Sequence, residues 1–256
     1  MKKGQKLWTR AELLLTMNLY CKLPFGKMHS RTPEVVALAG LLDRTPASIA
    51  LKLGNLASLD PSLQARGIRG ASNASKLDKE IWNEFYQNWD ELPFESERLL
   101  AQQSHTSLEK LLDLDENSLP KQGKEREQRI KARVNQQFFR QNIMAAYENR
   151  CCVTGLQQPQ LLIASHIRPW GLDESNRLNP RNGLALNALH DKAFEQGLMT
   201  ITADYTILIS NSLRQHNDQP MRQFFAAYHQ QPMQLPHRFV PDPDFLRYHH
   251  HERFIP

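Results

Sequence analysis

The pattern of the chain changes between its two halves, and this change constrains the fold more than any other feature. Helix-start signals recur before residue 92, whereas strand-like apolar runs follow after residue 150. The segment between them, residues 93–124, is polar and acidic, which is typical of a linker. A chain of 256 residues is long enough for two small domains. We therefore expect an α+β protein with an all-helical domain at residues 1–92, a linker at 93–124 and a second domain at 125–256.

Capping signals predict the helices of the first domain. Residues 9–12 have the form of a capping box, and Thr32-Pro33 and Thr45-Pro46 each place a threonine before a proline at the first helical position. The helices that start there have the size and turn of a helix-turn-helix motif. Its outward-facing side chains would be Ser48, Lys52 and Asn55. Two interpretations remain open, a helix that reads nucleic acid and a plain packed bundle or partner surface.

Two further helices follow. Ser75 is a capping residue for a helix whose side chains Ile81, Phe85 and Trp89 recur four apart, which predicts a core-facing stripe. A long helix at residues 123–149 combines an apolar seam with a basic outer face. We expect its apolar seam to pack on the second domain and its basic face to follow a phosphate backbone or simply to be solvated.

Composition limits the class of protein. The longest apolar stretches fall far short of the roughly 20 residues of a membrane span, so no membrane partner is expected. The N-terminal residues lack the apolar region of a secretory signal, so we expect a cytoplasmic protein. Three cysteines cannot build a disulfide framework. The net charge of +5 is compatible with a polyanionic partner without being diagnostic of one.

The second domain begins with strand-like runs. The runs at 150–155 and 160–167 flank a turn-prone segment and predict a β-hairpin with His166 on its second strand. A polar loop follows, and residues 184–197 have helical periodicity. The inward-facing side chains of that helix would be Leu184, Leu189 and Phe194. Two short β-like runs around Ala203-Asp204 predict another hairpin.

Three motifs in this region resemble the HNH endonuclease superfamily. They are the Cys-Cys-Val-Thr-Gly run at 151–155, the Ala-Ser-His-Ile-Arg-Pro-Trp run at 164–170, and the Asn-Gly-Leu-Ala-Leu run at 182–186 that leads to His190 and Phe194. The resemblance covers residues 129–200, most closely to a restriction-endonuclease-like branch. It implies a ββα-metal fold and metal-dependent hydrolysis of phosphodiester bonds.

The resemblance also implies roles for the site residues. His166 would be the general base, because histidine titrates nearest to neutral pH, and His190 would hold a divalent ion. Asn182 would bridge backbone groups and hold the His166 strand in place. The residue before the base, often an acidic or histidine ligand, is Ser165 here, so the second ligand is left open between water, Asp191 and a residue from elsewhere.

Nearby cations complete the predicted site. Arg168 and Lys192 are candidate phosphate clamps, and Arg133 and Arg140 of the preceding helix are candidate DNA contacts. The ion would be Mg²⁺ or Mn²⁺, with Ni²⁺ or Zn²⁺ as alternatives. No pair of cysteines flanks the motifs with the spacing of a structural zinc site.

Three functional classes follow from the sequence. The first is a DNA endonuclease of the restriction or host-defence kind, acting on double-stranded DNA and forming a homodimer if it cuts palindromes. The second is a non-catalytic DNA-binding protein with a degenerate HNH fold. The third is a toxin-like nuclease without site preference. We favour the first, and metal-dependent, sequence-dependent cleavage distinguishes it from the others.

Overall fold

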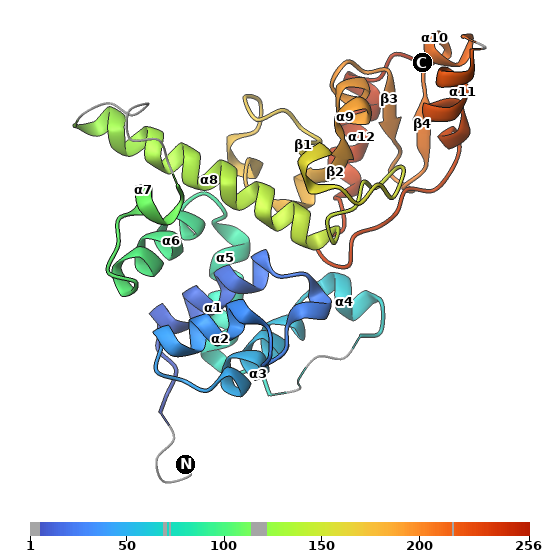
Figure 1. Ribbon diagram of the computed structural model, residues 1–256. Helices are drawn as coiled ribbons and strands as arrows, with labels where there is room; N and C mark the ends of the chain where they lie inside the picture. Colours follow the sequence, from blue (N-terminus) through green and yellow to red (C-terminus); the bar gives the residue numbers. More distant parts are fainter. Residues whose placement is uncertain (1–5, 69–70, 72, 114–121, 217) are drawn as a thin grey trace. The chain divides into compact units, whose positions relative to one another are not determined.

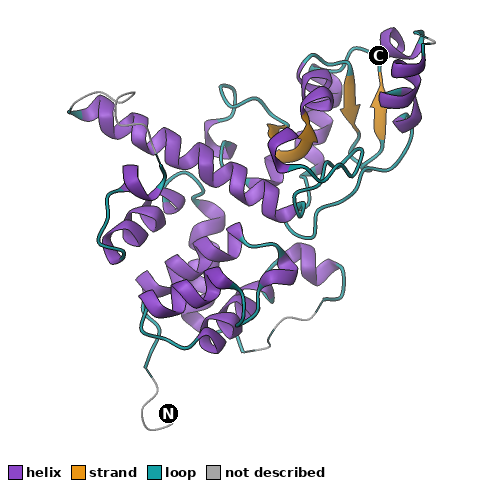
Figure 2. Ribbon diagram, in the orientation of Figure 1, coloured by secondary structure: helices purple, strands orange, loops and turns teal. Residues whose placement is uncertain are grey.

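The computed structural model describes residues 6–68, 71, 73–113, 122–216 and 218–256, and it divides the chain into two compact units. Unit 1 contains residues Met1–Gln141 and unit 2 contains residues Asn142–Pro256. In the described residues, helices occur in both units and the named strands occur in unit 2 (Figures 1 and 2). The composition is therefore α+β, as predicted. Within those residues, no helix is both long and apolar enough to cross a membrane.

Unit 1 is helical. Its elements are α1 (Arg10–Lys22), η1 (Phe25–Lys27), α2 (Pro33–Leu41), α3 (Pro46–Ala57), α4 (Pro61–Ala65), α5 (Lys76–Gln87), α6 (Leu92–Gln103), α7 (Leu108–Leu111) and most of α8 (Lys124–Ala146). Helix α1 packs against α3, α5 and α6. The predicted stripe is buried, since Ile81 and Phe85 of α5 and Trp89, two residues after this helix ends, are each less than a twentieth exposed.

Helix starts follow the capping signals with one exception. The Thr9 hydroxyl accepts a bond from the backbone of Glu12, whose carboxylate accepts from Thr9 N, so the predicted capping box is present. Thr45 caps α3 and Ser75 caps α5 in the predicted way. Thr32 does not cap α2, because its hydroxyl donates instead to the carbonyl of Lys27.

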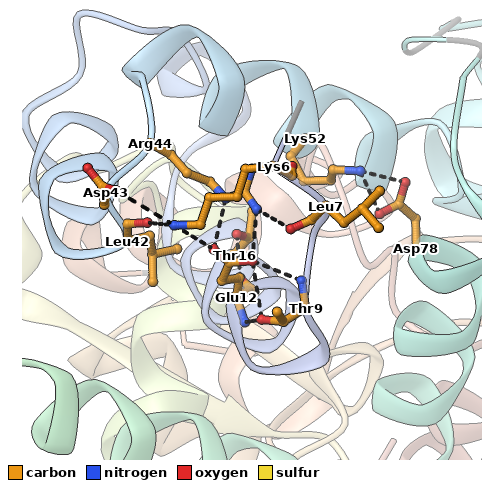
Figure 3. A network of polar contacts seen from close by, with 10 residues as sticks. All are labelled: Lys6, Leu7, Thr9, Glu12, Thr16, Leu42, Asp43, Arg44, Lys52 and Asp78. Atoms are coloured by element: carbon orange, nitrogen blue, oxygen red, sulfur yellow. Dashed lines mark hydrogen bonds and ion pairs between the residues drawn. The ribbon is translucent and has the colours of Figure 1, made fainter. Parts of the chain in front are cut away.

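Helix α3 does not present the polar face that the helix-turn-helix interpretation requires. Lys52 is buried, and its ammonium lies 2.9 Å from both carboxylate oxygens of Asp78 on α5 (Figure 3). The ammonium also lies 5.1 Å from the ring centroid of Trp8. Asn55 is buried as well. The expectation that Lys52 and Asn55 face outward is therefore wrong. The lysine side chain points into the bundle because it pairs with Asp78, a residue far away in the sequence.

Replacing Lys52 by alanine should destabilise unit 1 by about 3 kcal/mol, because it leaves the Asp78 carboxylate buried without its cation. The side chains of Lys52 and Asp78 are 10% and 0% exposed. Urea unfolding followed by circular dichroism measures the change. Lys76→Ala is the control, since the Lys76–Glu80 pair is exposed and should contribute less than about 1 kcal/mol. Equal losses in both variants would contradict the stabilising role of the buried pair.

The segment expected to be a linker contains helices α6 and α7. Helix α6 packs on α1, where Asn18 Nδ2 donates to Ser96 Oγ at 2.6 Å and to Glu97 Oε1 at 2.8 Å. The amide and carboxylate are buried together, so the acidic composition of this segment reflects buried polar contacts as well as surface charge. The boundary between the compact units lies at residues 141/142, later than the predicted 124/125.

Helix α8 continues from unit 1 into unit 2. The apolar seam of its first part packs within unit 1, where Phe138 lies 6.1 Å from the ring of Phe85 and Asn135 Nδ2 donates to the carbonyl of Asp90 at 3.1 Å. The expectation that the apolar seam packs on the second domain is therefore wrong for this first part of α8. Arg133 and Arg140 lie on exposed positions of α8 within unit 1.

Unit 2 contains two small sheets and several helices. Its elements are η3 (Pro159–Leu161), β1 (Leu162–His166), η4 (Glu174–Asn176), η5 (Pro180–Asn182), β2 (Gly183–Asn187), α9 (Ala188–Glu195), β3 (Met199–Ile201), β4 (Ile207–Ile209), α10 (Asn211–Arg214), α11 (Gln219–Phe224), η6 (Ala226–Tyr228) and α12 (Pro243–Glu252). Strands β1 and β2 pair antiparallel, with His166 opposite Gly183 and Ser165 opposite Leu184. Strands β3 and β4 form the second predicted hairpin.

The partner of β1 differs from the predicted one. Residues 151–156 form a tight turn, in which Gly155 N donates to Cys151 O at 2.9 Å and Gly155 has a φ of +73°. Strand β2 pairs with β1 instead, and helix α9 starts only at Ala188 because Asn187 caps it. Leu184 is consequently a buried strand residue, whereas Leu189 is 47% exposed and does not face the core.

Candidate active site

The end of β1 places His166 beside the loop that leads to β2. Its ring Nε2 lies 2.8 Å from the carbonyl oxygen of Arg177, and the edge of its ring contacts Trp170 at a centroid distance of 5.4 Å. A carbonyl can only accept a hydrogen bond, so Nε2 carries the proton and Nδ1 is the basic nitrogen of the neutral ring. Burial lowers the pKa of His166 and outweighs the opposing effect of the Arg177 carbonyl. The imidazole is therefore neutral at pH 7 and able to take a proton.

Asn182 connects the two ends of this loop. Its side-chain oxygen accepts from the backbone N–H of Arg168 at 2.8 Å, and its side-chain nitrogen donates to the carbonyls of Arg168 and Asn176, both at 3.2 Å. Its own carbonyl accepts from Ile167 N at 3.0 Å. The side chain is almost fully buried, so these bonds are shielded from water. Asn182 thus holds the backbone that directly follows His166.

An open cavity of about 600 Å³ lies between β1 and α9. Its walls include Ser165, His166, Asp191 and Glu195. Asp191 and Glu195 are four residues apart and share one face of α9. Burial raises the pKa of Asp191, and the charge of Glu195 raises it further, while a hydrogen bond from Ser165 opposes both effects. The cavity therefore combines the His166 imidazole with two carboxylates.

His190 lies outside this cavity. Its Nε2 is 2.7 Å from the carbonyl of Phe224, and its Nδ1 is 3.1 Å from Oδ1 of Asn187. The ring of His190 also hydrogen-bonds the Cys151 thiol. Burial raises the pKa of this thiol, but the hydrogen bonds from His190 and Thr154 outweigh burial and lower the pKa to about 7. The Phe224 carbonyl accepts a hydrogen bond from Nε2, and Nδ1 lies against the side-chain oxygen of Asn187, so both ring nitrogens of His190 have protein partners in the structure. The structure does not bring His190 together with His166.

The two carboxylates fit a hard divalent cation. Among the residues that the structure describes, no group of three or more histidine, cysteine or acidic side chains is arranged as a metal cluster. Mg²⁺ does not need one, since it usually binds through one or two carboxylates and completes its shell with water and substrate phosphate. Burial is the main cause that raises the pKa of Asp191, and a cation beside this carboxylate would favour its charged form.

The predicted phosphate clamps have other partners in the structure. Arg168 bonds to Asp173 at 2.9 Å, and its guanidinium lies 4.6 Å from the ring centroid of Tyr248 on α12. Lys192 is exposed and bonds to Glu195 at 2.8 Å. Neither side chain is among the walls of the His166 cavity.

Three polar residues of the cavity, Glu195, His249 and Arg253, were not predicted as site residues from the sequence. Glu195 could have been found from its spacing of four residues from Asp191 on a predicted helix. The other two, His249 and Arg253, come from α12 and the residue that ends it. His249 stacks on Phe194 at a centroid distance of 3.6 Å and bonds Thr200 at 2.9 Å, and burial lowers its pKa to about 4. No local sequence signal connects α12 to this site.

Comparison with known proteins identifies a family for the segment that contains β1, β2 and α9. A sequence model of the HNH endonuclease family HNH_2 matches residues 151–202, which contain β1, β2 and α9 together with His166, Asn182, Asp191 and Glu195. A search among curated proteins finds no match to the chain. The family match supports placing this segment in the HNH superfamily, which implies nuclease activity and nucleic-acid binding in general.

Proposed function

We propose that unit 2 is a metal-dependent endonuclease that hydrolyses phosphodiester bonds in DNA, with His166 as the general base. The observation that carries this proposal is the cavity that His166, Asp191 and Glu195 line together, within the segment matched by the HNH family. A base near neutrality and a pair of hard oxygen donors are the two components that such hydrolysis needs. Double-stranded DNA is the substrate that the resemblance favours.

His166 would take the proton of the attacking water on Nδ1. The Arg177 carbonyl fixes the ring through Nε2 and accepts from the imidazolium once it forms, so one contact orients the base and stabilises its product. Asn182 contributes by position, because its amide fixes the backbone of Arg168 two residues after the base.

Asp191 and Glu195 would hold the divalent ion. Such an ion polarises the scissile phosphate and stabilises the leaving oxygen. Oxygen donors favour Mg²⁺ or Mn²⁺ over softer ions. We assign these two carboxylates in preference to His190 because they line the cavity and His190 does not. Ser165 would orient Asp191 through its hydroxyl hydrogen bond.

The experiment that tests this function is digestion of supercoiled plasmid by purified protein in Mg²⁺, Mn²⁺, Ni²⁺ or EDTA. Nicking or linearisation that requires a divalent ion is the expected result, with RNA of matched length as the substrate control. Binding of DNA without cleavage in any metal would overturn the proposal and favour a non-catalytic HNH-like module. Discrete fragments, or a dependence on base methylation, would support a restriction or host-defence role; unspecific degradation would contradict that role and favour a toxin-like nuclease.

A further inference from the structure

The residue that ends α12, Arg253, lines the same cavity as His166 and the two carboxylates, far along the chain from all of them. We propose that Arg253 binds the phosphate of the scissile strand in this cavity. This inference rests on the proposed function, which concerns His166, Asp191 and Glu195 but does not require any contribution from α12.

Electrostatics give the first reason for this role. A phosphodiester carries a negative charge, and a cavity with two carboxylates repels it unless cations compensate. Among the described residues that line the cavity, Arg253 is the only arginine or lysine. Lys192 and Arg168 are engaged by Glu195 and Asp173. Arg253 is therefore the protein cation that the cavity itself presents to a phosphate.

The second reason is how firmly the backbone of Arg253 is positioned. Its N–H donates to the carbonyl of His249 at 3.0 Å, and the next residue but one, Ile255, donates its N–H to the carbonyl of Gly197 at 2.9 Å. Gly197 has a φ of +71°, and a Cβ there would lie 2.1 Å from the carbonyl oxygen of Arg253. His249, which begins this turn, is buried against Phe194. Buried contacts on both sides thus hold the backbone of an exposed arginine at the cavity.

The third reason is the donor capacity of the guanidinium. Arg253 Nη2 donates to the carbonyl of Glu195 at 3.2 Å, directly beside one of the two carboxylates. A guanidinium has five N–H donors in a planar fork, so this bond orients the group without exhausting its donors. A planar fork is suited to bidentate contact with phosphate oxygens. The side chain of Arg253 is exposed, whereas that of His249 is buried, so Arg253 contributes less to the packing of unit 2.

The test compares Arg253→Ala and Arg253→Lys with Arg247→Ala, a matched control in which an exposed arginine of the same helix loses its bond to Asp244. Cleavage of a labelled duplex is measured in saturating Mn²⁺ at several salt concentrations. We expect kcat/KM to fall about 10- to 100-fold in Arg253→Ala, the range of one charged hydrogen bond, with partial recovery in Arg253→Lys. The slope of log kcat/KM against log salt should fall by about 0.9, the value for one lost phosphate contact, and stay unchanged in Arg247→Ala.

Two results would overturn the inference. One is an Arg253→Ala variant with the kcat/KM and salt slope of wild type, which leaves the proposed function intact because wild type still cuts. The other is a loss of activity with an unchanged salt slope and a lower unfolding temperature, which would mean a structural role. If wild type does not cut at all, the proposed function fails. The affinity for duplex DNA in EDTA then tests phosphate binding by Arg253 separately. Equal affinity of the Arg253→Ala and Arg247→Ala variants would reject phosphate binding by Arg253.

Discussion

His166→Ala lowers the cleavage rate of unit 2 by about 10²- to 10⁴-fold, the range that a general base contributes. The loss follows from the removal of the imidazole, whose Nδ1 is the unprotonated nitrogen when Nε2 donates to the Arg177 carbonyl. Single-turnover cleavage of a duplex oligonucleotide in Mn²⁺ measures it. His251→Ala is the matched control, because His251 is exposed on α12 and is not among the residues that line the cavity. Equal cleavage rates for His166→Ala and wild type would contradict the assignment of His166 as the general base.

The pH profile adds a second test of the same residue. Burial lowers the pKa of His166 below its ordinary value of 6.5, so the neutral, base-competent form predominates at pH 7. Cleavage by wild type should therefore fall at acid pH, as the ring becomes protonated, with the midpoint of this fall below pH 6.5. An acid limb centred above pH 6.5 would contradict the neutral state of the buried ring. The profile should be recorded with Mn²⁺ at saturation at each pH.

Asp191→Asn abolishes metal-dependent cleavage at the Mn²⁺ concentration that saturates wild type and weakens Mn²⁺ binding by at least about 100-fold. Changes in outer partners of a metal site already cost about 10- to 100-fold, and a direct ligand contributes more. The amide keeps the size of the carboxylate, so the fold is retained, and loss of a charge whose pKa is raised by burial should not reduce stability. Isothermal titration with Mn²⁺ gives binding independently of activity.

His190→Gln distinguishes the two candidate ligand sets. It removes a buried ring that bonds Phe224 O and contacts Asn187, so it should lower the unfolding temperature of unit 2 while leaving Mn²⁺ affinity within about 3-fold of wild type, less than the loss from an outer partner. Asp191→Asn should weaken Mn²⁺ binding without lowering the unfolding temperature. A His190→Gln variant that unfolds like wild type but no longer binds Mn²⁺ would restore His190 as the ligand and would overturn our assignment of the carboxylates.

Local signals predicted local structure well. Thr9, Thr45 and Ser75 each bond the backbone three residues ahead, so the start of the helix is determined by neighbouring residues. His166 and Asn182 lie in the short segment matched by the family model, and their roles in the site stay predictions. Strand β2 was missed because Leu184 and Leu186 fit a helical as well as an alternating pattern, and the cap at Asn187 was not recognised.

Tertiary contacts account for the other differences. Lys52 was expected to face outward on helical spacing, but only the fold shows that Asp78 lies within reach of its ammonium. His249 had no distinguishing sequence context, yet it is buried beside Phe194. The cavity combines side chains from β1, α9 and α12. The sequence pattern of one element does not indicate which residues of another element pack beside it.

The sequence separations of these contacts suggest an order of assembly. His166 and Arg177 are 11 residues apart, and Arg168 and Asn182 are 14 apart, whereas His249 contacts Phe194 across 55 residues. Closing a longer loop costs more chain entropy, so contacts within β1, its loop and β2 can form before α12 docks. During folding, unit 2 would then position His166 early and Arg253 late. In an intermediate in which α12 is undocked, the base and the two carboxylates would be present without Arg253, and the missing cation would disfavour phosphate entry until folding is complete.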